Sequence, residues 1–194
     1  MRGVERFKYL QNVDVSSNAL TSLRPLSGIK HLIRLDASNN RITRMLDFEP
    51  PANLEVVIYS HNEISAIENA GLNPYIKCLR LDHNKIARIE GLANNTSLVQ
   101  LDISANCLTK IENLDGLNID MLSLAQNQIR KITGLANLPV LRQLDLSKNH
   151  IQQLAGLQWV ESLRHLDLSL NNGLKVLQLR YIENLALLTE LDLS

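Results

Sequence analysis

The stretch LRQLDLSKNHI, residues 141–151, carries leucines and one asparagine in a pattern that recurs along the chain. Residues 98–108, LVQLDISANCL, repeat it as L-x-x-L-x-L-x-x-N-x-I/L. The spacings between successive copies of this asparagine are 22, 22, 22, 22, 21, 22 and 22 residues. Its positions are Asn18, Asn40, Asn62, Asn84, Asn106, Asn127, Asn149 and Asn171. A fixed period of this length indicates a solenoid in which each repeat forms one coil.

The L-x-L segment of each repeat predicts a short strand with one buried face, because its apolar residues alternate. Successive strands should stack in parallel, about 4.8 Å apart, into one curved sheet. The five prolines all lie seven to twelve residues after a repeat asparagine, in the connectors: Pro25, Pro50, Pro51, Pro74 and Pro139. We therefore predict an α/β solenoid, a right-handed superhelix with a parallel concave β-sheet and short 3-10 or turn connectors on the convex side.

The repeated asparagine is predicted to have a structural role. It stands where the chain leaves the strand, and its amide can satisfy backbone groups that the turn would otherwise leave without partners.

The two ends of the chain interrupt the repeat. FKYLQNVDV, residues 7–15, begins directly on a repeat, and LTELDLS, residues 188–194, ends before its asparagine. We therefore expect one domain over residues 1–194, with about nine repeats of 21–25 residues, taken from a longer protein. The last interval is 25 residues, from Leu163 to Leu188, and its connector LKVLQLRYIENLALL is expected to be more helical than the others.

Composition excludes several classes of function. Twenty basic and twenty acidic residues cancel, so no overall field favours nucleic acid or an acidic membrane. The two cysteines are too few for a disulfide framework, and no 18-residue apolar run is present. These features predict a cytoplasmic protein without membrane insertion.

The chain carries no phosphate-binding loop, dinucleotide fingerprint, HExxH, GxSxG or CxxC motif, so we predict neither enzymatic activity nor a cofactor. His61 and His83 share one register in adjacent repeats, which places their rings about 5 Å apart. Two histidines without a third ligand make a weak metal site. They are expected to be solvated edge residues, and no metal site is predicted.

The residues that flank the strand leucines should face the concave side. Most positions just after the second repeat leucine are aspartates, but the middle of the stack is apolar around a single arginine. The predicted contact centre consists of Val56, Ile58, Cys78, Arg80 and Met121. The predicted polar rim consists of Asp102, Asp145 and Asp167. An apolar patch edged by polar residues is typical of a contact surface, although Val56 and Ile58 are also residues that strands tolerate singly. The aspartates are either an ordinary feature of the repeat or a site for a basic partner, which would relieve their repulsion.

The 22-residue period and the stretches NKIARIEGL (84–92) and NQIRKITGL (127–135) resemble the SDS22-like class of leucine-rich repeats. The irregular copies, FEPPANLEVV and the short LDGLNIDMLSLAQNQI, are similar to those of leucine-rich repeat proteins that also carry a guanylate kinase domain. The resemblance implies a scaffold of the ciliary or flagellar axoneme, part of a larger assembly, that binds a protein on its concave face. Two alternatives are the repeat region of a larger guanylate-kinase-like protein and a regulator of a protein phosphatase. Nucleotide chemistry is assigned to no residue of this chain.

Overall fold

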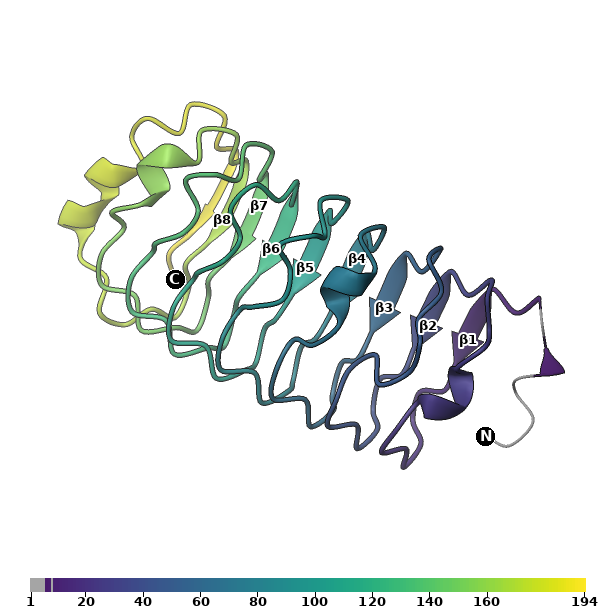
Figure 1. The fold of residues 1–194 in the computed structure, drawn as a ribbon. Coiled ribbons are helices and arrows are strands. Elements are labelled where there is room, and N and C mark those ends of the chain that lie inside the picture. The colour runs from purple at the N-terminus through teal and green to yellow at the C-terminus, as the bar shows by residue number, and fades with distance from the viewer. Residues whose placement is uncertain (1–5, 8) are drawn as a thin grey trace.

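The computed structural model describes residues 6, 7 and 9–194, which form a solenoid with one parallel sheet of nine strands in chain order (Figure 1). Each strand has three residues and overlaps a predicted L-x-L segment, beginning one residue before its first leucine position. The strands are β1 (Asn12–Asp14), β2 (Arg34–Asp36), β3 (Val56–Ile58), β4 (Cys78–Arg80), β5 (Gln100–Asp102), β6 (Met121–Ser123), β7 (Gln143–Asp145), β8 (His165–Asp167) and β9 (Glu190–Asp192). The predicted strands and their parallel stacking are therefore confirmed.

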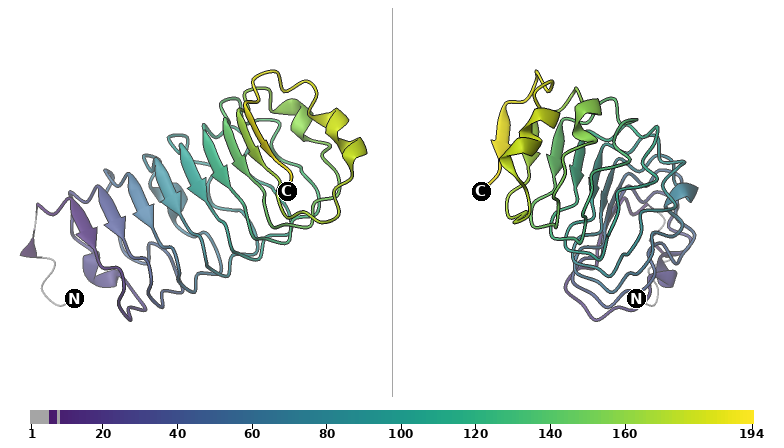
Figure 2. Two further views of the ribbon diagram at one scale, coloured as in Figure 1. Left: turned by 180° about the vertical axis from the view of Figure 1, so that it is seen from behind. Right: turned by 90° about the vertical axis from the view of Figure 1, so that its left-hand side faces the viewer.

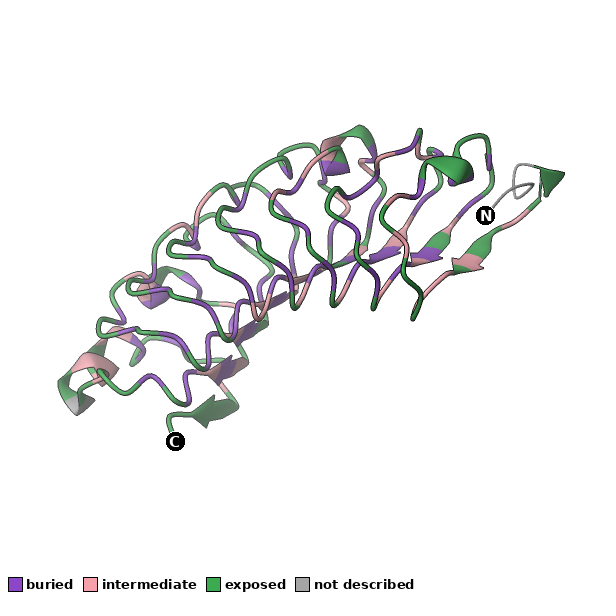
Figure 3. Ribbon diagram, turned by 90° about the horizontal axis from the view of Figure 1, so that it is seen from below, coloured by how far each residue is buried: buried purple, intermediate pink, exposed green. Residues whose placement is uncertain are grey.

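The connectors are turns and short 3-10 helices, as predicted. The helices of the described residues are η2 (Arg24–Leu26), η3 (Ala70–Leu72), η4 (Leu157–Trp159) and η5 (Val176–Tyr181). The longest of them, η5, lies in the long last interval, which confirms that this connector is the most helical. The strands follow the inner, concave side of the arc and the connectors follow its outer side (Figure 3).

The core is a continuous stack of apolar side chains between the sheet and the connectors. The central strand residues Leu35, Val57 and Leu101 are fully buried, and the neighbouring coils repeat this arrangement. Views from behind and along the axis show how one coil covers the next (Figure 2). At the end of the sheet, Leu191 in β9 is 41% exposed. Burial is therefore shared between coils, and a single coil does not enclose a core of its own.

The repeat asparagines join adjacent coils, which confirms their predicted structural role. The Asn106 amide nitrogen donates to the carbonyl oxygens of Ile103 at 3.2 Å and Ser104 at 2.9 Å in its own coil. The same nitrogen donates to Leu81 O of the preceding coil at 2.9 Å. Its Oδ1 accepts from the Ile86 backbone N–H at 2.8 Å. The asparagines at 40, 62, 84, 127, 149 and 171 repeat this set of bonds.

Most coils turn through two left-handed backbone positions. The residue just before the repeat asparagine has φ between 50° and 56° in eight successive coils, from Ser17 to Leu170. The second position is usually glycine or asparagine. At Gly156, φ is 111° and a Cβ atom would lie 2.3 Å from the Ile132 carbonyl oxygen, so only glycine fits. At Asn69, φ is 61°, and the side chain instead donates to Leu46 O of the preceding coil at 3.1 Å.

Tyr59 is the irregular core residue of the third coil. It is fully buried where the neighbouring coils carry Ala37 and Leu81. Its hydroxyl oxygen accepts a hydrogen bond from the Leu46 backbone N–H at 3.0 Å. Burial raises the pKa of Tyr59, so the phenol stays neutral and satisfies a backbone donor inside the core.

Replacing Asn106 with Asp should lower the free energy of unfolding by about 3–5 kcal/mol, because a buried carboxylate would face three carbonyl oxygens that now receive N–H donors. Urea unfolding followed by circular dichroism measures the loss. Asn94→Asp is the control, since Asn94 is exposed and makes one bond of 3.4 Å to Gly71 O. That variant should change stability by less than about 0.5 kcal/mol. Equal losses in the two variants would contradict the assigned role.

Replacing Tyr59 with Phe should cost about 1–3 kcal/mol, because the buried Leu46 N–H would lose its acceptor. The same urea titration measures this change. Tyr75→Phe is the matched control, because Tyr75 is 57% exposed. A loss no larger in Tyr59→Phe than in the control would show that the hydroxyl does not satisfy this donor.

Candidate functional site on the concave face

Two rows of side chains, one on each side of the buried central residues, form the concave surface. The first row runs through Asn12, Arg34, Val56, Cys78, Gln100, Met121, Gln143, His165 and Glu190. The second row runs through Asp14, Asp36, Ile58, Arg80, Asp102, Ser123, Asp145, Asp167 and Asp192. Both rows follow from the strand register, so every predicted contact residue belongs to one of them.

The predicted contact centre is brought together only in part. Val56 and Cys78 are half-buried neighbours in the first row, whereas Gln100 separates Cys78 from Met121. The Cys78 thiol donates to Gln100 Oε1 across 3.6 Å, and burial raises the pKa of Cys78. A thiol held neutral in this way is a poor nucleophile.

Ile58 does not form the open apolar surface that the sequence predicts. It lies in the second row between Asp36 and Arg80, but only 8% of its surface is exposed. Neighbouring strands are only about 4.8 Å apart, so the residues beside Ile58 in its row can cover most of its side chain. The prediction of an exposed Ile58 is wrong, and the apolar centre reduces to Val56 and Cys78 next to the exposed Arg80.

The aspartates of the second row belong to the turn that follows each strand. Asp145 Oδ1 accepts from the Ser147 backbone N–H at 3.0 Å and from its hydroxyl at 2.7 Å. Asp102 and Ser104 form the same pair. Hydrogen bonds from Ser194 hold the pKa of Asp192 below its ordinary value, which shows how the turn favours the charged carboxylate. The interpretation of these aspartates as an ordinary feature of the repeat is therefore supported, while their negative charges remain at the surface.

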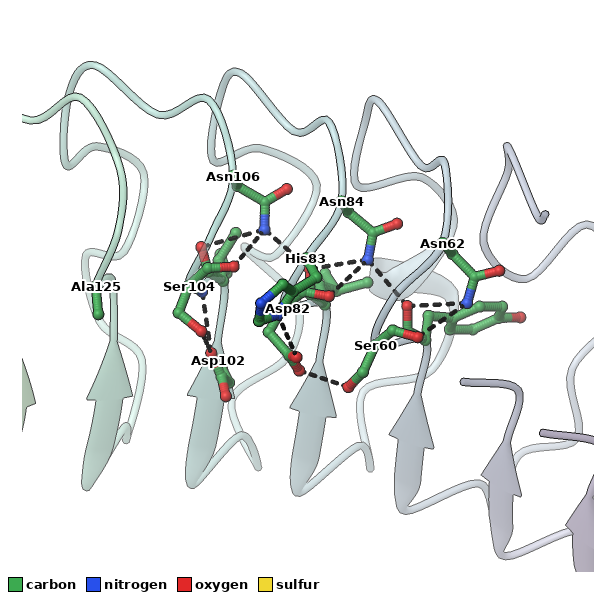
Figure 4. A network of polar contacts seen from close by, with 12 residues as sticks. Ser60, Asn62, Asp82, His83, Asn84, Asp102, Ser104, Asn106 and Ala125 are labelled. Carbon is green, nitrogen blue, oxygen red and sulfur yellow. Dashed lines mark hydrogen bonds and ion pairs between the residues drawn. The ribbon is translucent and has the colours of Figure 1, made fainter. Parts of the chain in front are cut away.

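Where the second row lacks an aspartate, the bonds of the turn are rearranged. In the third coil Ile58 takes the aspartate position, and the Ser60 hydroxyl donates instead to Asp82 Oδ1 of the next coil (Figure 4). Asp82 Oδ2 lies 3.1 Å from His83 Nδ1. The rings of His61 and His83 stack with their centroids 3.9 Å apart. The register predicts this histidine pair, but the role of Asp82 was missed because that position holds serine in most coils.

A hollow on the concave face lies over β5–β9 and has a volume of about 690 Å³. It contains Met121 and the three predicted rim aspartates, while Val56, Ile58, Cys78 and Arg80 lie outside it. Among the described residues that line it, the charged side chains are Asp102, Asp145, Asp167, Glu190 and Asp192, together with the ionisable His165. The His165 ring nitrogen Nδ1 lies 2.8 Å from Glu190 Oε2. The hollow is therefore acidic, and the three aspartates predicted for the rim are among the residues that line it.

Comparison with solved structures finds leucine-rich repeat solenoids of the same fold. The chain matches the structure of an internalin (inlF) from Listeria monocytogenes with a TM-score of 0.84 and 25% identity, covering 98% of this chain and 56% of that one. It matches internalin C2 (inlC2) from the same organism with a TM-score of 0.83 and 24% identity, covering 94% of this chain and 80% of that one. A leucine-rich repeat protein of Leptospira interrogans matches with a TM-score of 0.81 and 23% identity, covering 97% of this chain and 50% of that one.

No curated protein sequence matches the chain. Within the described residues, no helix has the length and apolarity needed to cross a bilayer. A family model described as the Endo-beta-N-acetylglucosaminidase EndoS LRR domain matches residues 48–171, which is more than half of the chain. The repeat skeleton, the stacked sheet and this match agree, and the chain belongs to that leucine-rich repeat family.

Proposed function

We propose that this chain is a non-enzymatic protein-binding scaffold whose concave face holds a basic segment of a partner. The leucine-rich repeat solenoid is a fold typical of protein–protein interaction scaffolds and is generally non-enzymatic. The observation that carries the proposal is the acidic hollow over β5–β9, in which carboxylates from successive strands face the same space.

Charge complementarity favours a partner rich in lysine or arginine. Asp145, Asp167 and Asp192 stand in register on consecutive strands, about 4.8 Å apart, and like charges at this spacing repel one another. A basic segment that crosses the strands would replace this repulsion with ion pairs. Arginine suits such a row best, because its planar guanidinium can bond two carboxylate oxygens at once.

The surface is already arranged for binding. Serine donors hold the carboxylates of Asp102, Asp145 and Asp167, and the strands beneath them are fixed by the buried core. Binding therefore requires little ordering of the scaffold, which lowers its entropic cost. Val56 and Cys78, beside the exposed Arg80, extend the same face beyond the hollow and would contact an apolar part of the partner.

A more specific identity remains a prediction. A place in the cilium or flagellum, a link to a guanylate-kinase-like domain and regulation of a phosphatase all depend on the resemblance of NKIARIEGL and NQIRKITGL to SDS22-like repeats. The concave-face proposal is independent of that resemblance, because it depends only on the geometry and charge of the sheet.

The triple variant Asp102→Asn/Asp145→Asn/Asp167→Asn should weaken binding of a fluorescent lysine- and arginine-rich peptide by about 5- to 100-fold, since each surface ion pair contributes up to about 1 kcal/mol. Asparagine keeps the side-chain oxygen that accepts from the serine two residues later, so the turns should be preserved. Fluorescence anisotropy at two salt concentrations measures the affinity, and the difference between the proteins should shrink at the higher salt concentration.

The matched control is Glu68→Gln/Glu90→Gln/Glu112→Gln, which removes three carboxylates from the connectors. Glu68 and Glu112 pair there with Arg44 at 2.9 Å and Arg88 at 3.3 Å. The control should bind the peptide as the wild type does. Equal losses in the two triple variants, or a wild type that binds a glutamate-rich peptide equally well, would contradict a basic-segment site in the hollow.

A further inference from the structure

Three side chains that can bind a metal ion meet at the C-terminal ends of β3 and β4, outside the acidic hollow. They are His61, Asp82 and His83, and one ligand atom from each lies within 4.8 Å of the other two. None of these three residues lines the concave hollow, so the cluster is separate from the surface proposed to bind a protein.

The repeat itself holds the two histidines in place. His61 and His83 each precede a repeat asparagine, and each has a φ of 54°. Asn62 and Asn84, which follow them, are buried and bonded to the adjacent coils. The rings stack with a centroid separation of 3.9 Å and an interplanar angle of 18°. The stacking brings nitrogens of the two rings close together, and rotation about the side-chain bonds of these exposed histidines would aim both lone pairs at one ion.

Asp82 supplies the third donor and is already oriented. Its Oδ2 faces His83 Nδ1 at 3.1 Å, and its Oδ1 accepts from the Ser60 hydroxyl (Figure 4). Ser60 is available for this bond because β3 ends in Ile58, where other coils carry an aspartate that engages their own serine. Because residue 58 is Ile and not Asp, the Ser60 hydroxyl is free to orient the Asp82 carboxylate in the next coil.

The donor set is not repeated in the following coils. The positions of Asp82 and His83 are occupied by Ser104 and Ala105 in the next coil, and by Ala125 and Gln126 in the one after it. The periodicity of the solenoid therefore does not require these three residues. The cluster is a local departure from the repeat.

Two imidazoles and one carboxylate are donors that Zn²⁺ and neighbouring divalent transition metals accept, and three protein ligands leave a fourth position open. With bonds of about 2.0–2.2 Å, tetrahedral ligand atoms lie about 3.3–3.6 Å apart. The observed limit of 4.8 Å requires a small closure, which rotation of the exposed histidine side chains can provide. We propose that His61, Asp82 and His83 bind one Zn²⁺ or a similar late first-row divalent ion, with its open position available to water or to a side chain of a partner.

Isothermal titration of untagged, chelator-treated protein with ZnCl₂ tests the site. The wild type should bind one ion per chain. His61→Ala and His83→Ala should each weaken binding by about tenfold or more, because loss of even an outer-sphere partner costs about 10- to 100-fold in metal affinity. Alanine suits both positions, since Ala105 has a φ of 50° at the same place in its coil. Asp82→Asn should also weaken binding, because an amide oxygen is a poorer ligand for Zn²⁺ than a carboxylate.

The control variant is His150→Ala, which removes another exposed histidine beside a repeat asparagine and should bind Zn²⁺ as the wild type does. Circular dichroism confirms that each variant is folded. Cobalt(II) gives a second readout, since a tetrahedral Co²⁺ site has visible absorption bands that should vanish in both histidine variants. The proposal is overturned if the wild type shows no saturable binding of Zn²⁺, or if His61→Ala and His83→Ala bind it as tightly as the wild type. In that case Asp82 and His83 form a hydrogen-bonded surface pair only.

Discussion

The hydrogen bonds of the repeat asparagine are the constraint on which the rest of this structure depends. From Asn40 to Asn171, each of these side chains connects carbonyl oxygens of two coils and accepts from the backbone of the preceding one, as Asn84 does with Tyr59, Leu81 and Ile64. A buried amide must satisfy its donors and its acceptor, so the distance and register between coils are set together. The alignment of the strands, the stacked core and the rows on the concave face all follow from this connection. Even the 21-residue repeat keeps it, because Asn127 still bonds Ile103 O of the preceding coil at 3.0 Å.

The sequence alone predicts the parts of the fold that depend on the repeat. The L-x-L strands, the structural asparagine, the turn-like connectors and the more helical last interval were all correctly inferred, because each is a local pattern repeated many times. Features that depend on neighbouring coils were less accessible. Ile58 occupies a strand position that should face the concave side, but the residues around it leave only 8% of its surface exposed. The orientation of Asp82 depends on a hydrogen bond from Ser60, which belongs to another coil.

The position of the concave hollow could not be predicted from the sequence. The rows of side chains can be written down from the register, but the volume that they enclose depends on curvature, which accumulates over many coils. The predicted site was centred on the apolar residues near β3, whereas the enclosed space lies over β5–β9. The aspartates predicted for a rim line this hollow, and the proposed function makes them the main contact surface. Their hydrogen bonds to serine explain why the repeat carries them, and their charge explains how a binding function can use them.

The left-handed residue before each asparagine has a consequence for how such a protein acquires new chemistry. Its backbone geometry is nearly constant, while its side chain varies freely between serine, asparagine, histidine, alanine, glutamine, lysine and leucine. The coil bears the conformational cost of this position whatever side chain it carries. The residues that precede the repeat asparagines therefore form a row of positions that accept different side chains, at a spacing set by the sheet. A single substitution beside an existing polar residue places two functional groups within reach of each other without a change of fold.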